Sequence, residues 1–191
     1  MAFRFAPSST PARVALVLVP LLLALALLVP AAPANARPAA CSAAHVNVER
    51  APIRMARNAT LCLLNRVRAR HGLPPLRMNP KLSRAARKHS RDMVRRRYFA
   101  HDSLDGRSPF ERMRATRYVP RGASWVLGEN LGWGSGSLAE PKALLRAWMR
   151  SPGHRRNILD GRFRDIGIGI VRGAPVGGHG ATYTTDFGRR S

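Results

Sequence analysis

The chain has 191 residues, with 33 Lys or Arg against 10 Asp or Glu, and a formal net charge of +23 at pH 7. This length is enough for one domain that buries a sizeable core, and it requires no second domain. Beyond residue 36, no apolar run approaches the roughly 20 residues of a membrane-spanning helix, which excludes a protein with several membrane spans.

Residues 1–36 have the features of an export signal. Arg4 and Arg13 precede an apolar run over residues 14–28, and a stretch of small residues ends at Ala36, where we expect cleavage. The apolar run is shorter than a spanning helix requires, so we expect a cleaved signal and a secreted protein. An uncleaved anchor is the alternative.

The mature chain would keep 31 basic and 10 acidic side chains, a net charge of +21. Such a charge favours contact with an anionic cell-wall polymer or a phospholipid surface, so the protein is expected outside the cell, associated with the envelope. A generally solvated basic surface is the alternative interpretation. Nucleic acid is not favoured as a partner, because export removes the protein from it and no pattern of interleaved aromatic and basic residues appears.

The two cysteines, Cys41 and Cys62, are expected to form one disulfide if the protein is exported. Two free thiols or a metal-binding pair are the alternatives. Lipid attachment to Cys41 is disfavoured, because Pro38 stands where a lipoprotein signal carries leucine. We expect residues 37–55 to be an extended amino-terminal arm that Cys41 ties to the domain of residues 56–191.

Two helices are predicted after this arm. Residues 56–71 show helical periodicity, with Leu61, Leu64 and Arg68 on one side, and the following Gly72 ends the helix. A turn follows, and Asn79 then serves as N-cap of a second helix that runs to about residue 97. The apolar face of this helix is predicted to consist of Leu82, Ala85, Ala86, His89 and Met93, which makes His89 a core histidine.

Two further helices are predicted from capping boxes. Ser108 with Glu111 and Ser137 with Glu140 each have the spacing at which the serine caps the helix and the glutamate bonds back to it. The first opens a short helix, and the second opens a helix over residues 138–150. Both glutamates are therefore interpreted as cap residues rather than as catalytic acids. The buried side chains of the last helix are predicted to be Leu144, Leu145 and Trp148.

Three strands are predicted around these helices. Residues 125–132 form a strand that enters a Gly/Ser loop, and residues 165–170 and 181–187 form an antiparallel hairpin across the loop of residues 173–180. Gly167 and Gly169 leave one face of the hairpin without side chains, so we expect a helix to pack closely there. The fold class is therefore α+β.

Three ionisable residues lie at element ends or in a short strand, namely His101, Glu129 and His154. Together they would suit a divalent cation such as zinc, a proton relay or a buried structural network. Their spacing is not that of a local metal motif, so the pattern alone does not choose among these roles. A serine nucleophile at Ser103 or Ser151 is disfavoured, because neither serine follows a strand-to-helix nucleophile elbow.

Many short motifs occur in an order that resembles the CAP superfamily of cysteine-rich secretory, antigen-five and pathogenesis-related proteins. The motifs are LNR (64–66) with Arg70, LPPL (73–76), LSRAA (82–86), HSRDM (89–93), FAH (99–101), GENL (128–131), WMRSPGHRRNIL (148–159), GIG (167–169) and YTTDF (183–187). The resemblance covers residues 59–188 and is closest to small secreted bacterial members. It implies an α-β-α sandwich, in which a small antiparallel sheet lies between helices.

The family cleft gathers two histidines and two acidic residues, so the resemblance implies that His101, Glu129 and His154 share a cleft. Ser151 occupies the position where many eukaryotic members carry the second acid. The expected function is a non-enzymatic CAP domain that binds a small, lipid-like ligand or a divalent cation there, without a catalytic residue. The alternative is a metal-assisted hydrolase, in which zinc on the two histidines activates water and Glu129 handles the proton.

Overall fold

The computed structural model describes residues 41–190, which belong to one compact unit. The export signal, its cleavage point at Ala36 and the first part of the arm lie outside the described residues. The elements in chain order are α1 (Ile53–Arg70), β1 (Arg77–Met78), α2 (Pro80–Arg96), α3 (Pro109–Ala115), β2 (Trp125–Gly134), the 3-10 helix η1 (Gly136–Ala139), α4 (Pro141–Arg150), α5 (Pro152–Leu159), β3 (Asp165–Arg172) and β4 (Ala181–Arg190).

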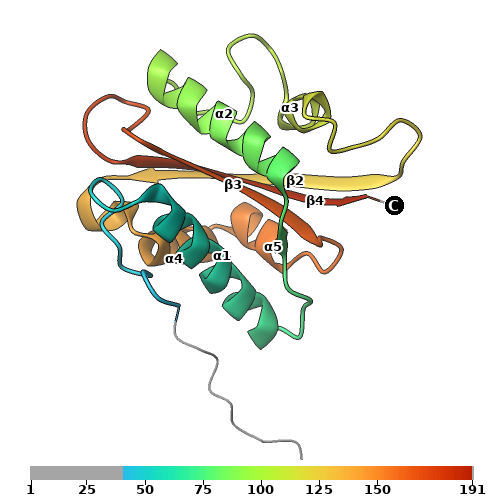
Figure 1. Cartoon of the computed structure of the whole chain (residues 1–191), viewed down its shortest axis with the longest axis horizontal. Helices are drawn as coiled ribbons and strands as arrows, with labels where there is room; N and C mark the ends of the chain where they lie inside the picture. Colours follow the sequence, from blue (N-terminus) through green and yellow to red (C-terminus); the bar gives the residue numbers. More distant parts are fainter. Residues whose placement is uncertain (1–40, 191) are drawn as a thin grey trace, which may run out of the picture. The chain divides into compact units, whose positions relative to one another are not determined.

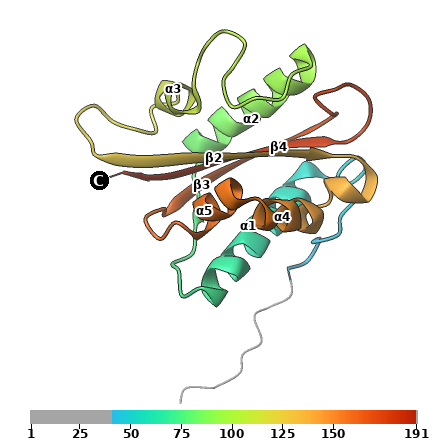
Figure 2. The ribbon, with the colours of Figure 1, turned by 180° about the vertical axis from the view of Figure 1, so that it is seen from behind.

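These elements form three layers. The sheet has the order β1-β3-β4-β2 and lies between α2 and α3 on one face and α1, α4 and α5 on the other (Figure 1). The view from behind shows the same layers (Figure 2). The predicted α+β class and α-β-α sandwich are confirmed.

The sheet is built on the predicted hairpin. β3 and β4 pair antiparallel, and β2 pairs antiparallel with β4 along its full length. Because β2 stands last in the strand order, it is an edge strand. The sheet is mixed rather than purely antiparallel, because the two residues of β1 pair in parallel with the start of β3. A strand of two residues has no periodicity, so the sequence did not predict it.

The close packing of a helix on Gly167 and Gly169 is confirmed. A Cβ atom at Gly167 would overlap the backbone of Leu82, and one at Gly169 would overlap the backbone of Ala86. Both contacts come from α2, whose predicted apolar face is buried in full. The two glycines therefore set how closely α2 approaches the sheet and the residues beside it.

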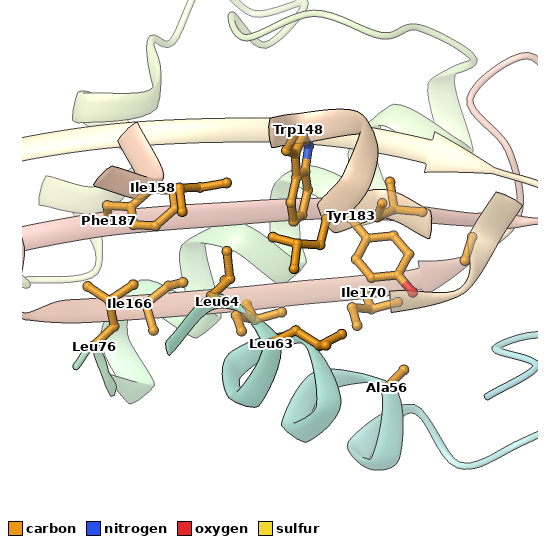
Figure 3. Close-up of a cluster of buried hydrophobic side chains, with 14 of the residues drawn as sticks. Ala56, Leu63, Leu64, Leu76, Trp148, Ile158, Ile166, Ile170, Tyr183 and Phe187 are labelled. Atoms are coloured by element: carbon orange, nitrogen blue, oxygen red, sulfur yellow. The ribbon is translucent and has the colours of Figure 1, made fainter. Parts of the chain in front are cut away.

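The main core lies on the opposite face of the sheet, between the strands and α1, α4 and α5 (Figure 3). Leu64 of α1 and Trp148 of α4 are almost completely buried in it, as are Leu144 and Leu145 of the predicted inner face. The Trp148 indole Nε1 donates to the Leu131 carbonyl at 2.7 Å, so its polar atom is satisfied inside the core.

The amino-terminal part of the described chain is tied to α1 by the predicted disulfide between Cys41 and Cys62. Before α1, residues 41–51 form turns rather than an extended arm. The helix begins at Ile53, three residues earlier than predicted, directly after Pro52, and Ile53 packs against the core. The end near Gly72 is as predicted, since this glycine has a positive φ of 67°.

One of the two predicted capping boxes is present. The Ser108 hydroxyl accepts from the Glu111 backbone N–H, and the Glu111 carboxylate accepts from the Ser108 backbone N–H. The prediction for Ser137 and Glu140 was wrong. Ser137 lies in η1, and Glu140 precedes α4 without a side-chain cap bond and instead contacts His45 at 2.8 Å.

The chain continues as a helix after Ser151, where the sequence predicted only a break. Ser151 ends α4 and also serves as N-cap of α5, whose first residue is Pro152. Proline is well suited to a first helical position, because the N–H that it lacks would have no partner there. The new helix carries His154 in its first turn and so decides where this imidazole lies.

Candidate functional site

The candidate site lies at the edge of the sheet formed by β2. Glu129 is on this strand, His101 is in the segment between α2 and α3, and His154 is in the first turn of α5. The two histidines thus come from opposite helical layers. The pKa of His154 is lowered mainly by burial and also by the positive charge of His101. The structure brings His101 and Glu129 into direct contact and places His154 on the helix that packs beside β2.

Glu129 is the centre of this arrangement. Its side chain is only 3% exposed, and each carboxylate oxygen has a cationic or potentially cationic neighbour. Its Oε1 lies 2.8 Å from Nδ1 of His101, and its Oε2 accepts from Nη2 of Arg112 at 2.8 Å. The carboxylate is therefore held in one orientation by two bonds.

These contacts decide the protonation of the pair. Burial raises the pKa of Glu129, but the bond from His101 and the charge of Arg112 outweigh it, so the net pKa lies below the usual glutamate value. The same bond to Glu129 raises the pKa of His101 despite the opposing effect of its partial burial. Glu129 is therefore a stable carboxylate, and His101 takes up a proton more readily than an ordinary histidine.

Arg112 of α3 was missed by the sequence analysis. It is 8% exposed, and besides Glu129 its guanidinium bonds the Arg107 carbonyl at 2.9 Å and the Ser103 hydroxyl at 3.2 Å. It therefore fixes the segment that carries His101. In a chain with 33 basic residues, no sequence signal distinguishes this one.

Two asparagines join β2 to α5 on the other face. Asn130 is fully buried, and its amide donates to the His154 carbonyl at 3.1 Å. Asn157 donates to the Glu129 carbonyl at 3.0 Å and to Oδ1 of Asn130 at 2.9 Å. The Asn130 side chain thus fixes the start of α5. Asn157 lies in the motif of residues 148–159, but the sequence did not indicate that its side chain joins α5 to β2.

Asp186 of β4 is a second buried acid that the sequence analysis missed. It is paired with Glu129 in the strand register and is 2% exposed. Burial, together with the negative charge of Glu129, raises the pKa of Asp186 well above the usual aspartate range. Because Glu129 keeps its charge, Asp186 is the member of the pair that holds a proton.

His89 is buried, as predicted, with 1% of its surface exposed. Its Nε2 lies 3.0 Å from the Ala100 carbonyl, and Nδ1 has no partner among residues 41–190. Burial lowers the pKa of His89, so the ring is neutral and donates from Nε2. One nitrogen of this core histidine therefore remains unsatisfied.

Comparison with known proteins decides the family. The chain matches the Cysteine-rich secretory protein family (CAP) over residues 61–185. The chain belongs to this family. YkwD of Bacillus subtilis (strain 168) is 38% identical to it over 115 residues, which are 60% of this chain and 42% of YkwD. The membrane protein YlbC of the same strain is 30% identical over 112 residues, 59% of this chain and 30% of YlbC.

Solved structures agree with the CAP assignment. An extracellular protein containing a SCP domain from Bacillus anthracis str. Ames is 26% identical, with a TM-score of 0.55 over 72% of this chain and 43% of that chain. An outer surface protein from Borrelia burgdorferi, 18% identical, has the same fold with a TM-score of 0.63 over 74% of this chain and 97% of that chain. This CAP domain is thus of bacterial type and spans less than half of YkwD and of the Bacillus anthracis protein.

In this CAP domain, Ser151 lies at the junction of α4 and α5, where its backbone N–H donates to Trp148 and its carbonyl accepts from Arg155. It supplies no carboxylate to the cleft. Across residues 41–190, no three His, Cys, Asp or Glu side chains are grouped so that they could hold a metal ion. Both oxygens of Glu129 are already bonded, one to His101 and one to Arg112, so this carboxylate is not free to bind a cation.

Of the helices in the described part of the chain, none is both long enough and apolar enough to span a membrane.

Proposed function

We propose that this protein is an exported, non-enzymatic CAP domain whose cleft binds a small ligand through His101 and His154, with a divalent cation such as zinc as the first candidate. The observation that carries the proposal is the bond between His101 Nδ1 and Glu129 at 2.8 Å. It leaves Nε2 of His101 without a hydrogen bond to any residue between 41 and 190, on a side chain that is 54% exposed.

A carboxylate that bonds one imidazole nitrogen commonly orients the other toward a metal ion and makes it a better donor. The second donor would be His154, whose imidazole has no hydrogen bond within residues 41–190. Two imidazoles suit zinc, and the remaining positions would be filled by water or by an incoming ligand. Two protein ligands fit an open, weakly binding metal site rather than a closed structural one.

The alternative, a metal-assisted hydrolase, requires Glu129 to accept a proton from a metal-held water. Glu129 is poorly suited to this step, because both oxygens are occupied and Arg112 and His101 lower its pKa. The geometry therefore favours binding over hydrolysis.

The cleft is tested by titrating the protein with zinc in a calorimeter. We expect one bound ion, and an affinity that falls about tenfold or more when His101 or His154 is replaced by alanine. His179→Ala is the matched control, because His179 is exposed in the loop between β3 and β4. Equal affinity in all three variants, or no binding by the unchanged protein, would refute the cation site.

The envelope location is supported by the signal-like residues 1–36, the disulfide and the name of the extracellular Bacillus anthracis relative. The excess of basic over acidic side chains would then hold the protein on an anionic cell-wall polymer or phospholipid. Cosedimentation with cell-wall sacculi and with anionic vesicles should fall steeply as salt rises. Binding that does not respond to salt would contradict this part of the proposal.

A further inference from the structure

A separate cavity of about 390 Å³ lies between α2, α3 and the segment that joins them. The cleft residues His101, Glu129 and His154 do not line it. Its charged lining residues are Arg84, Lys88, Asp92, Arg107, Arg112 and Arg117. Five cationic side chains thus surround a cavity with one carboxylate, in a volume typical of sites for small molecules.

The positive charge of this cavity is only partly compensated. Arg107 pairs with Asp105, and Arg112 pairs with Glu129. The other three cations, Arg84, Lys88 and Arg117, form no ion pair with any residue between 41 and 190.

The one acid in the lining does not compensate these three cations. Asp92 accepts from the Tyr98 hydroxyl at 2.5 Å and lies 3.9 Å from Arg96, so its charge is already shared. Several cations that converge without counter-charges favour binding of an anion with several oxygens.

One residue of the cavity lining, His89, has a buried polar atom without a partner among residues 41–190. His89 lines the cavity, is 1% exposed and has an unsatisfied Nδ1 within the described part of the chain. Because Nε2 faces the Ala100 carbonyl, the neutral ring presents Nδ1 as an acceptor. A buried polar atom of this kind is costly unless a hydroxyl or water satisfies it. His89 is therefore a buried, uncharged residue of the lining, and the charge that the cavity offers to a ligand comes from its cations.

We infer that this cavity binds the phosphate group of a compact ligand, from either a small soluble organophosphate or a phospholipid headgroup. A phosphate has three or more acceptor oxygens, which matches a site with two or more unpaired cations better than a single carboxylate would. The segment between α2 and α3 also exposes Phe99 and Leu104, with 45% and 55% of their surfaces accessible. These side chains would contact acyl chains if the phosphate belongs to a lipid.

The test compares two double variants of the full chain with the same change in charge. Arg84→Glu with Lys88→Glu alters the cavity, whereas Arg87→Glu with Arg91→Glu alters exposed positions of the same helix that do not line it. Binding of glycerol phosphate is measured by calorimetry. Binding to phosphatidylcholine vesicles, with and without phosphatidylglycerol, is measured by cosedimentation.

We expect the cavity variant to lose about tenfold or more in affinity, while the control variant changes by less than about threefold. If the cavity variant loses affinity for glycerol phosphate, the ligand is a soluble organophosphate. Loss for anionic vesicles alone, with a further loss in Leu104→Ser, identifies a headgroup. Equal loss in both double variants would mean a diffuse basic surface and would overturn the inference, as would the absence of binding in both assays.

Two controls keep these outcomes interpretable. The melting temperature should be unchanged in both double variants, since all four substituted side chains are exposed. Zinc binding through His101 and His154 should also persist in the cavity variant. The phosphate site and the proposed cation site can therefore fail independently. Arg112 is left unchanged, because it also holds Glu129.

Discussion

Glu129 carries a buried negative charge that is stabilised by two hydrogen-bonded neighbours, and the fold would lose stability if either the charge or its neighbours were removed. Arg112 and His101 both point to its oxygens at 2.8 Å. Removal of the Glu129 charge would leave the Arg112 guanidinium buried without its counter-ion. The stability lost when one partner of a buried ion pair is removed is larger than the net stability that the pair contributes. The sequence indicated Glu129 from its motif but could not indicate Arg112, because partner choice depends on how α3 packs.

We predict that Glu129→Gln lowers the free energy of unfolding by about 3 kcal/mol, because the amide cannot accept from both neighbours with a full charge. Chemical denaturation measures this change. Glu111→Gln is the matched control, since glutamine also completes a capping box at this exposed position and should change stability by less than about 0.5 kcal/mol. Similar losses in the two variants would contradict the role of Glu129 in the buried network.

Asp186 should make stability depend on pH in the direction opposite to a salt-bridged acid. Its pKa is raised in the folded state, so the folded protein holds a proton that the unfolded chain releases near pH 4. Its contribution is therefore most favourable below pH 4 and is lost as the pH rises toward the folded-state pKa. The charged groups that face it are Glu129 from β2 and Arg112 from α3.

We predict that Asp186→Asn raises the melting temperature at pH 7 by about 2 to 4 °C, equivalent to about 1 kcal/mol. At about pH 3 the difference from the unchanged protein should largely disappear, because most of the aspartate is then protonated in both states. Thermal unfolding across this pH range measures the effect. Asp105→Asn should give no gain, since Arg107 lowers the pKa of Asp105 through a side-chain bond. A gain for Asp186→Asn that is equal at both pH values would refute the assignment.

At the scale of elements, α2 is the part of the fold that the sequence described most completely. The N-cap Asn79, the buried apolar face and the glycine-lined strand against which the helix packs were all predicted and are present. Each feature depends on neighbours in the chain or on a period of two or 3.6 residues, so each can be read locally. In contrast, α5 was not predicted, because proline and glycine after Ser151 also fit a simple break.

We predict that Gly169→Ala lowers the free energy of unfolding by about 1 to 3 kcal/mol or more, because the new methyl group would overlap the backbone of α2. Denaturation with urea measures the loss. Gly153→Ala in α5 is the control, where the added Cβ meets only a flexible arginine atom at 3.8 Å. The control should be neutral or stabilising by up to about 1 kcal/mol. Tolerance of Gly169→Ala would show that α2 can move away from the sheet.

At the scale of the whole described unit, Arg68 joins parts of the chain that are distant in sequence. It is fully buried in α1, and its guanidinium donates to the carbonyls of Pro74, Ile158, Asp160 and Phe163 at 2.8 to 3.2 Å. Burial lowers the pKa of Arg68, but the carbonyls provide the acceptors that water would otherwise supply. The periodicity placed Arg68 on the inner side of the helix without indicating these partners.

We predict that Arg68→Lys lowers the free energy of unfolding by about 3 kcal/mol, because a single ammonium group cannot reach acceptors that are spread around a planar guanidinium. Chemical denaturation measures the loss, and zinc affinity at His101 and His154 should change little in the folded variant. Arg70→Lys, at an exposed position of the same helix, is the control and should lie within about 0.5 kcal/mol of the unchanged protein. A loss of the same size in Arg70→Lys would contradict the special role of Arg68.

The sequence by itself determined the features that depend on near neighbours or on strong pairing rules. These are the helical periods, the Ser108 cap, the β3–β4 hairpin, the pairing of two lone cysteines and the motif order that indicated the family. Only the tertiary structure decided that Arg112 and Asp186 flank Glu129 and that Asn157 fixes the start of α5. It also decided that one cavity is lined by three cations that form no ion pair within residues 41–190. The physical reason is that a charged side chain selects its partner by distance and burial after packing, and neither quantity is encoded in the local spacing of residues.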